Sequence, residues 1–258
     1  MMEKLTIIKV GGKIVEEQVS LHSLLCSIAD IPGAKVLVHG GGRSATALAS
    51  RLGIETVMIS GRRVTTPEML DVVTMVYGGK VNKTIVAQMQ SRGINALGLT
   101  GADLNVISGH KREVKDVDYG MAGDVDAVDG KILASLISTG VLPVMAPLIH
   151  DGKGNMLNTN ADTIAAETAK ALSAFFDVTL VYCFEKPGVL ADENEDNSVI
   201  EKITEQTYPE LVQNGTVKGG MLPKLQNAFD ALKGGVTEVI ITKADNVKNL
   251  SLGTHIVL

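Results

Sequence analysis

The chain has 258 residues, 45% of them hydrophobic, and a formal net charge of −5. It is long enough for one or two domains with a large buried core. Charged residues are mixed along the chain without a basic block, and aromatic residues make up only 3%. This composition argues against nucleic-acid binding and against attachment to a membrane surface. No charge-free apolar run reaches the ~18 residues that a spanning helix needs.

The N-terminal segment and the cysteines do not indicate export. The apolar run 5–10 is too short for the core of a signal peptide and leads directly into glycines. Cys26 and Cys183 each lie in an apolar run, which is typical of buried thiols in a reducing compartment. No spacing of Cys and His fits a structural zinc site. We therefore expect a cytoplasmic protein and identify no metal-ligating residues.

Short apolar runs rich in β-branched residues alternate with helical patterns. In chain order the sequence predicts strand 5–10, helix 22–29, strand 35–38, helix 44–52, helices 69–77 and 82–91, strand 96–100, helix 131–139, strand 141–147, helix 162–173, strand 178–184, helix 222–232, and strands 236–242 and 255–258. Such alternation predicts an α/β fold with a largely parallel sheet that helices cover on both faces.

Three segments interrupt this alternation. Residues 56–66 and 106–125 are richer in glycine, charge and alternating patterns, which favours β-hairpins that form a lid over the C-terminal edge of the sheet. Residues 192–197 form an acidic stretch that we expect to be solvated surface. No repeat or linker is evident. We expect one compact unit with two lobes, residues 1–175 and 176–258.

Glycines lie after two predicted strands and before one predicted helix, and phosphate groups commonly bind at such places. Gly11-Gly12 follow the first strand, Gly40-Gly41-Gly42 follow the second, and Gly219-Gly220 precede a helix. Backbone N–H groups at such places lack partners and can bind anions. The spacing does not match a Walker A loop, a dinucleotide-binding G-x-G-x-x-G or a G-x-S-x-G nucleophile turn. These familiar classes are therefore disfavoured.

Charged residues beside the glycines indicate an anionic ligand. Lys9 lies inside an apolar strand, where burial requires an anionic partner, unless the strand is an edge strand from which the lysine reaches solvent. Lys224 lies near a helix start, where it opposes the helix dipole, unless it is an ordinary surface lysine. Asp162 opens a helix and is either its N-cap or a carboxylate that holds both lysines.

Other polar residues fit a small carboxylate ligand. Asn158 and Asn160 lie two positions apart and could direct both amides the same way. Arg63 follows a short β-like run, and arginine binds carboxylates in a bidentate manner.

Five segments occur together in a fixed order: IIKVGGK at 7–13, VHGGG at 38–42, GRRVTT at 61–66, NTNAD at 158–162 and GGMLPKL at 219–225. Together they resemble the amino acid kinase family, and within it the acetylglutamate kinase branch, from about residue 5 to the C-terminus. The resemblance implies a three-layer αβα sandwich and a crevice shared by two lobes. It implies ATP with Mg²⁺, and phosphorylation of the side-chain carboxylate of an N-acylated glutamate in arginine biosynthesis.

The resemblance also implies roles for individual residues. The N-terminal lobe would bind the acylated amino acid and the C-terminal lobe the nucleotide. Lys9 and Lys224 would stabilise the transferred phosphoryl group, Asp162 would orient both lysines, and Gly12 and Gly41 would donate backbone N–H groups. Substrate would be bound by Gly41, Gly42, Arg63, Asn158 and Asn160. Nucleotide would be bound by Lys9, Gly11, Gly12, Glu185, Lys186, Gly188, Val189, Leu190, Thr216, Gly219, Gly220, Met221 and Lys224.

The sequence departs from the family pattern in three places. FEKPGVL at 184–190 replaces an expected T-D-V-x-G-V-like stretch. Arg62 occupies a position that is usually apolar, so it could bind a second carboxylate and make N-succinylglutamate the substrate, unless strand alternation directs it to solvent. No helix precedes the first strand, which resembles the dimeric, arginine-insensitive members, and we expect a homodimer.

Other functions remain to be weighed. Within the family the chain could be an aspartate, glutamate, aminoadipate-derivative, carbamate or UMP kinase. From different classes it could be a catalytically silent nucleotide-binding regulatory domain, or a Rossmann-type oxidoreductase. The combination of Lys9, Asp162 and Lys224 argues against a silent domain, and the glycine spacing argues against the oxidoreductase.

Overall fold

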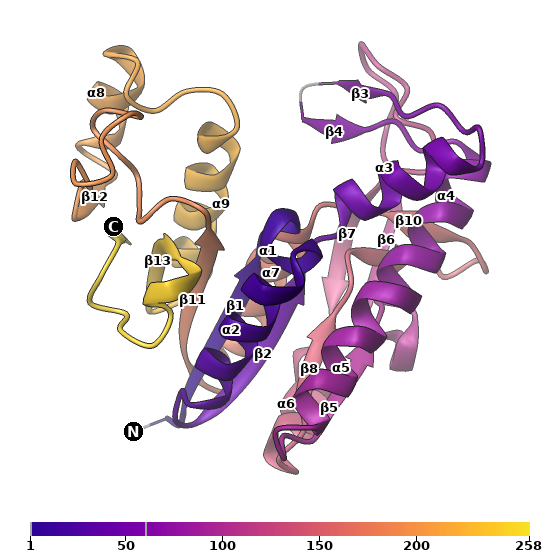
Figure 1. The fold of residues 1–258 in the computed structure, drawn as a ribbon, viewed down its shortest axis with the longest axis horizontal. Helices are drawn as coiled ribbons and strands as arrows, with labels where there is room; N and C mark the ends of the chain where they lie inside the picture. The colour runs from indigo at the N-terminus through magenta and orange to yellow at the C-terminus, as the bar shows by residue number, and fades with distance from the viewer. Residues whose placement is uncertain (1, 60) are drawn as a thin grey trace.

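A computed structural model describes residues 2–59 and 61–258 of the chain. Its centre is an eight-stranded sheet of order β12-β14-β13-β11-β1-β2-β8-β5 (Figure 1). The strands are β1 (Lys4–Val10), β2 (Ala34–His39), β5 (Ala96–Leu99), β8 (Leu142–Met145), β11 (Asp177–Phe184), β12 (Lys202–Thr204), β13 (Glu238–Lys243) and β14 (Thr254–Val257). All neighbours pair in parallel except β13 and β14. The predicted mainly parallel α/β sandwich is confirmed.

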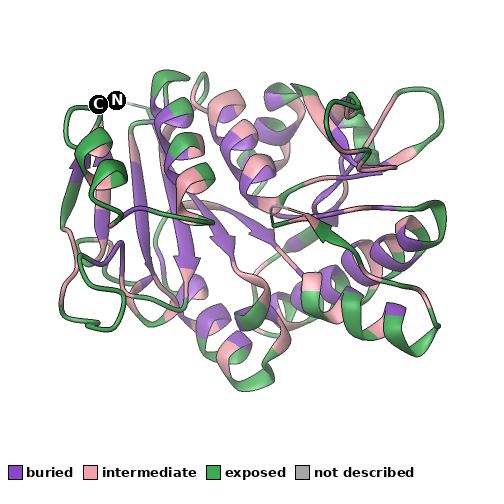
Figure 2. Ribbon diagram, turned by 90° about the horizontal axis from the view of Figure 1, so that it is seen from above, coloured by how far each residue is buried: buried purple, intermediate pink, exposed green. Residues whose placement is uncertain are grey.

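Helices cover both faces of this sheet. One face carries α1 (Gly12–Glu16), α2 (Gln18–Ala29), α3 (Gly42–Arg51), α4 (Pro67–Val73) and α5 (Asn82–Gln90), and the other carries α6 (Gly130–Ser138), α7 (Ala161–Leu172) and α9 (Met221–Lys233). Figure 2 shows the central strands buried and the outward helix faces exposed. In the described part of the chain, no helix has both the length and the apolar character needed to cross a bilayer.

Alternation along β1 decides which face each of its side chains meets. Leu5 and Ile7 pack in the core under α6, α7 and α9, whereas Ile8 and Val10 pack in the core under α2 to α5. Lys9 shares the parity of Leu5 and Ile7, so its side chain points toward α7 and α9. Because β1 lies between β11 and β2, the alternative that Lys9 lies on an edge strand is wrong.

Both predicted hairpins are present beyond the ends of the central strands. β3 (Met58–Ile59) pairs antiparallel with β4 (Arg62–Arg63); Ser60 of this hairpin lies outside the described residues. β6 (Ile107–Lys111) pairs antiparallel with β7 (Gly123–Val128). The second pair belongs to a four-stranded sheet with β9 (Leu148–His150) and β10 (Met156–Asn158), two short strands that the pattern does not predict.

The helices expected at 69–77 and 82–91 are joined in the structure. A π-helical segment, Thr74–Val81, connects α4 to α5 without a break. Gly78-Gly79 suggests an interruption in the sequence because glycine is a poor helix former. In the structure the helix continues through both glycines, and Val76, Tyr77 and Val81 of the same segment are buried. The segment carries Tyr77, and π-helical turns often occur at functional sites.

A buried histidine holds the end of β2 in place. His39 has an exposed fraction of 0%. Its Nδ1 lies 2.7 Å from the carbonyl oxygen of Gly40, and its Nε2 lies 3.1 Å from Asn82 Nδ2, which also donates to the carbonyl of Val144 at 2.9 Å. These partners assign a neutral ring with the proton on Nδ1. Burial lowers the pKa of His39 to about 4; the Gly40 bond opposes this shift and the Lys83 charge adds to it.

This histidine should make stability depend on pH. Because its folded pKa of about 4 lies below the unfolded value of 6.5, the stabilisation is complete above pH 6.5 and is lost as the pH falls toward 4. We expect a loss of about 3 kcal/mol of unfolding free energy across that window, at about 1.4 kcal/mol per pKa unit. Denaturant unfolding from pH 7 to 4 should show a smaller loss for His39→Gln. Equal losses in both proteins would contradict the assignment.

Candidate active site

A large cavity of about 870 Å³ lies at the C-terminal ends of β1, β2 and β11. β1 is flanked by β2 on one side and by β11 on the other, so the chain leaves the middle of the sheet in two directions. Ligands of open α/β sheets bind at such switch points. The lining comes from both predicted lobes and includes Lys9, Gly12, Gly41, Arg63, Glu185 and Lys224.

The glycine-rich ends of β1 and β2 approach each other closely. A Cβ on Gly40 would lie 3.3 Å from the Gly12 nitrogen, and a Cβ on Gly12 would lie 3.7 Å from the Gly42 nitrogen. Gly41 has a φ of 155°, and a Cβ there would lie 3.0 Å from Tyr77 Cδ1. A side chain at Gly41 would therefore be strained, and one at Gly40 would be tight against the Gly12 backbone. The result is a wall of backbone amides at the start of α3, which suits an anionic group.

An ion-pair triad lies beside this wall. Lys9 Nζ is 2.6 Å from Asp162 Oδ1, and Lys224 Nζ is 3.4 Å from Asp162 Oδ2. Lys9 comes from β1, Asp162 from the first turn of α7 and Lys224 from the first turn of α9. The two amines also lie 5.0 and 4.8 Å from the centre of the Phe184 ring. The structure therefore brings together residues that are far apart in the chain.

The triad is largely shielded from water. The side chains of Lys9 and Asp162 are 9% and 10% exposed, and that of Lys224 is 24% exposed. Burial acts to raise the pKa of Asp162, but the charges of Lys9 and Lys224 outweigh it and hold this pKa below its usual value. Asp162 is therefore ionised, and with two cations the triad keeps one net positive charge. That excess charge faces the cavity and favours an anion.

The alternative roles considered for these residues do not hold. Asn160, not Asp162, is the N-cap of α7: its side-chain oxygen accepts from the Asp162 backbone N–H at 2.7 Å. Lys224 is ion-paired and partly buried, so it is not an ordinary surface lysine. Lys9 and Lys224 converge on one carboxylate, as the sequence predicts.

A smaller cavity of about 220 Å³ adjoins the first and shares Lys9, Gly41 and Arg63 with it. The buried Arg63 donates through Nη2 to the Gly42 carbonyl at 2.8 Å and to Thr46 Oγ1 at 3.0 Å. Asn158 also lines this cavity, and its Nδ2 donates to Thr65 Oγ1 at 2.9 Å. Cationic and amide groups thus line a space of the right size for a small carboxylate.

Arg62 is not directed fully to solvent. It is half-buried and lines the small cavity together with Arg112, which is ion-paired with Asp124. Burial lowers the pKa of Arg62, and the nearby charge of Arg112 lowers it further, although Asp124 and Tyr119 oppose the shift. Among the described residues Arg62 has no carboxylate within ion-pair distance. The small cavity therefore carries more positive than negative charge.

Some of the residues predicted to bind the nucleotide line the large cavity, and others do not. Glu185, Lys186, Gly188, Gly220 and Met221 line the large cavity with Gly11 and Gly12, whereas Val189, Leu190, Thr216 and Gly219 are not among its lining residues. Val189 and Leu190 are buried in the protein. These two positions support the segment from inside rather than facing the cavity.

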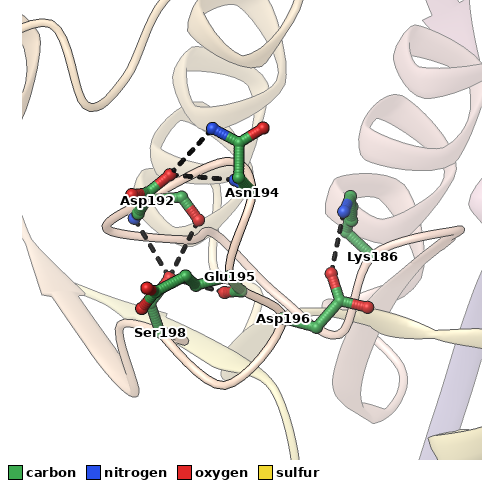
Figure 3. A network of polar contacts seen from close by, with 6 residues as sticks. All are labelled: Lys186, Asp192, Asn194, Glu195, Asp196 and Ser198. Carbon is green, nitrogen blue, oxygen red and sulfur yellow. Dashed lines mark hydrogen bonds and ion pairs between the residues drawn. The ribbon is translucent and has the colours of Figure 1, made fainter.

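The acidic stretch 192–197 is exposed, as expected, but it is also ordered by its own hydrogen bonds (Figure 3). Asp192 Oδ1 accepts from the Asn194 backbone N–H at 2.9 Å, and Ser198 Oγ donates to the Glu195 carbonyl at 2.7 Å. Asp196 Oδ1 lies 2.7 Å from Lys186 Nζ. The loop therefore holds the ammonium group of Lys186 at the border of the cavity.

Sequence reasoning misses several residues of the site. The sequence analysis assigns no role to Phe184, Tyr77, Arg112 or Lys13, which all line one of the two cavities. Their places depend on packing between distant segments, for which the sequence carries no local signal. One signal is available for Lys13, which directly follows the glycine pair and has the opposite sign of charge to Glu185.

Comparison with known proteins places the chain in a family. A model of the amino acid kinase family matches residues 4–243, and the chain belongs to that family. Within it, the chain is 66% identical to a Bacteroides thetaiotaomicron protein named acetylglutamate kinase, over 99% of both chains. It is 63% identical to a Phocaeicola vulgatus protein of the same name, again over 99% of both chains.

Solved structures share the fold. A Streptococcus mutans protein is 28% identical, with a TM-score of 0.80 over 98% of both chains. Carbamate kinase from Giardia lamblia bound to AMP-PNP is 16% identical, with a TM-score of 0.72 and 98% of both chains covered. The second likeness concerns the fold alone.

Gly41 offers a test of the glycine wall. We expect Gly41→Ala to destabilise the protein by about 1–3 kcal/mol, because the new methyl group meets the Tyr77 ring in a backbone conformation that side chains rarely adopt. Gly79→Ala is the matched control, since a Cβ there meets nothing within 4 Å and its φ is not positive. Denaturant unfolding should show a loss for the first variant and little change for the second. Equal effects would contradict the packing argument.

Proposed function

We propose that this protein is an acetylglutamate kinase that transfers the γ-phosphoryl group of ATP to the side-chain carboxylate of an N-acylated glutamate. The observation that carries the proposal is the convergence of Lys9 and Lys224 on Asp162 where two cavities meet. The names of the close relatives support the reaction and N-acetylglutamate as its acceptor. The product is an acyl phosphate, and its formation is a step of arginine biosynthesis.

The attacking carboxylate is already a nucleophile, so the site needs alignment and positive charge rather than a general base. In the proposal, the small cavity holds the acylglutamate with Arg63, Asn158 and the Gly41-Gly42 backbone, while Asn160 fixes the start of α7. The large cavity holds ATP. Lys9 and Lys224 neutralise the negative charge on the phosphoryl group as it moves from ATP in the large cavity to the carboxylate in the small cavity.

Asp162 acts as a positioning residue in this proposal. It is held between the two lysines and keeps their amines from repelling each other before ATP arrives. Gly12 and Gly41 donate backbone N–H groups to the transferred phosphoryl oxygens, where a side chain would block the approach.

Mg²⁺ enters this proposal with the nucleotide. Among the described residues no cluster of three or more His, Cys, Asp or Glu could hold a metal ion. Mg²⁺ in kinases is bound largely by substrate phosphates and water, and Glu185 is the carboxylate of the large cavity outside the triad. The ion would neutralise the charge on the ATP phosphates.

The wider expectations belong to the same proposal. Residues 1–175 would bind the acylglutamate and form a homodimer contact, and residues 176–258 would bind the nucleotide. A cytoplasmic location fits the use of ATP and the two free cysteines. The ion-paired triad of Lys9, Asp162 and Lys224 argues against a catalytically silent regulatory domain. The names of the close relatives argue against other kinases of the family.

A second candidate concerns the acyl group. Arg62 and Arg112 bring two guanidinium groups to the small cavity, and of these two Arg112 is ion-paired with Asp124. An acyl group that ends in a carboxylate would balance this charge. N-succinylglutamate is such a substrate, and it differs from N-acetylglutamate by that added carboxylate arm.

The central proposal is tested by trapping the acyl phosphate with hydroxylamine in the presence of ATP and each acylglutamate. We expect Lys9→Ala to lower kcat by about a hundredfold or more, since loss of one oxyanion-type donor costs about 3 kcal/mol, while calorimetry finds nucleotide affinity largely unchanged. Lys233→Ala, which removes a distant exposed ion pair with Glu205, should retain normal turnover. A near-normal kcat in Lys9→Ala would remove Lys9 from the mechanism.

The acyl group is tested by comparing kcat/KM for the two substrates. If Arg62 binds a second carboxylate, the wild-type protein has a kcat/KM about tenfold or more higher for N-succinylglutamate. A tenfold ratio corresponds to a free-energy difference of about 1.4 kcal/mol. Arg62→Leu should abolish this preference and leave turnover of N-acetylglutamate largely intact. A strong preference of the wild-type protein for N-acetylglutamate ends the second candidate.

A further inference from the structure

One ion pair in the nucleotide cavity has no part in the proposed chemistry. Lys13 Nζ lies 2.8 Å from Glu185 Oε2, and the two side chains are 50% and 49% exposed. Both residues line the large cavity together with Lys9 and Lys224. Lys13 is thus a third lysine at the place proposed for the ATP phosphates, and its charge is balanced by a carboxylate of the same cavity.

The fold fixes this position. β1 and β11 are neighbouring parallel strands, with Val10 in register with Cys183. Lys13 lies in α1, directly after Gly12, and Glu185 directly follows β11. Both side chains therefore start from the C-terminal ends of adjacent strands, at the edge of the sheet where the glycine wall lies.

The energetics of this pair differ from those of the triad. The Asp162 carboxylate is buried between two lysines, and removing a partner from a buried pair is costly. A half-exposed pair contributes little, because water already solvates both charges. The terminal phosphates of ATP carry several negative charges and strong acceptor oxygens. Lys13 can therefore leave Glu185 at small cost when phosphates enter the cavity.

Lys186 provides a contrast within the same cavity. Its ammonium is held by Asp196 from the exposed acidic loop, as Figure 3 shows, and Asp196 does not line the cavity. The contact therefore draws Lys186 toward the loop. The partner of Lys13, in contrast, is itself a lining residue of the cavity.

We propose that Lys13 binds the terminal phosphates of the nucleotide and that Glu185 is its partner only while the cavity holds no phosphate. Glu185 then competes with the nucleotide for Lys13. The inference deepens the proposed function and rests on it, because it assumes that ATP binds in the large cavity.

The test is calorimetric titration of the full chain with ATP, ADP and AMP in the presence of Mg²⁺. We expect Lys13→Met to weaken ATP about tenfold, as loss of a charge-assisted contact does, and to leave AMP nearly unchanged. Glu185→Gln should tighten ATP about two- to fivefold by removing the weak competitor. In the double variant, Glu185→Gln should no longer change the affinity for ATP, because the Lys13 ammonium group for which Glu185 competes is absent. Lys233→Met is the matched control, and thermal melts check that each variant is folded.

The outcomes separate this inference from the proposed function. Wild-type protein that binds no ATP overturns both. Wild-type protein that binds ATP, with unchanged affinity in folded Lys13→Met, overturns only the role of Lys13. If Glu185→Gln weakens ATP equally with and without Lys13, Glu185 contacts the nucleotide itself and the exchange is excluded.

Discussion

The arrangement of the site depends on one buried carboxylate shared by two ammonium groups. Lys9 and Lys224 would repel each other without Asp162, and Asp162 could not remain ionised in its buried position without them. The three residues come from β1, α7 and α9, so this one contact ties the centre of the sheet to two of the helices on one face. The net positive charge that is left over favours an anion in the cavity.

The neighbouring glycine wall meets a different constraint, which is steric. Two strand ends approach until backbone nitrogens lie where side chains would otherwise stand, and Gly41 packs against the Tyr77 ring. At the same strand end, the His39 ring is hydrogen-bonded to Asn82 and to the Gly40 carbonyl. Positive side chains thus lie on one side of the cavity and backbone amides on the other. The charge pairs farther out, Lys13 with Glu185 and Lys186 with Asp196, are exposed to solvent.

Much of the fold was predictable because hydrophobic periodicity reports local structure. The central strands and most helices follow the expected runs, and both hairpins occur where glycine and charge interrupt the pattern. The errors have local causes. Short elements such as α1, α8 (Tyr208–Gln213), β9 and β12 carry too few residues for a period to emerge. The predicted break near Gly78 follows from glycine propensity, which the burial of Val76, Tyr77 and Val81 in the core overrides.

The sequence by itself determined the order of the elements, the glycine-rich strand ends and the unusual lysine within an apolar strand, because each is a local property of neighbouring residues. Only the tertiary structure decided which charges meet. It gave the N-cap of α7 to Asn160 and left Asp162 free to bind two lysines, and it placed Phe184 beneath both amines. It also turned Arg62 and Arg112 toward one cavity and set Lys13 beside Glu185. These contacts join residues far apart in the chain, and they depend on strand order and side-chain parity, which no local pattern encodes.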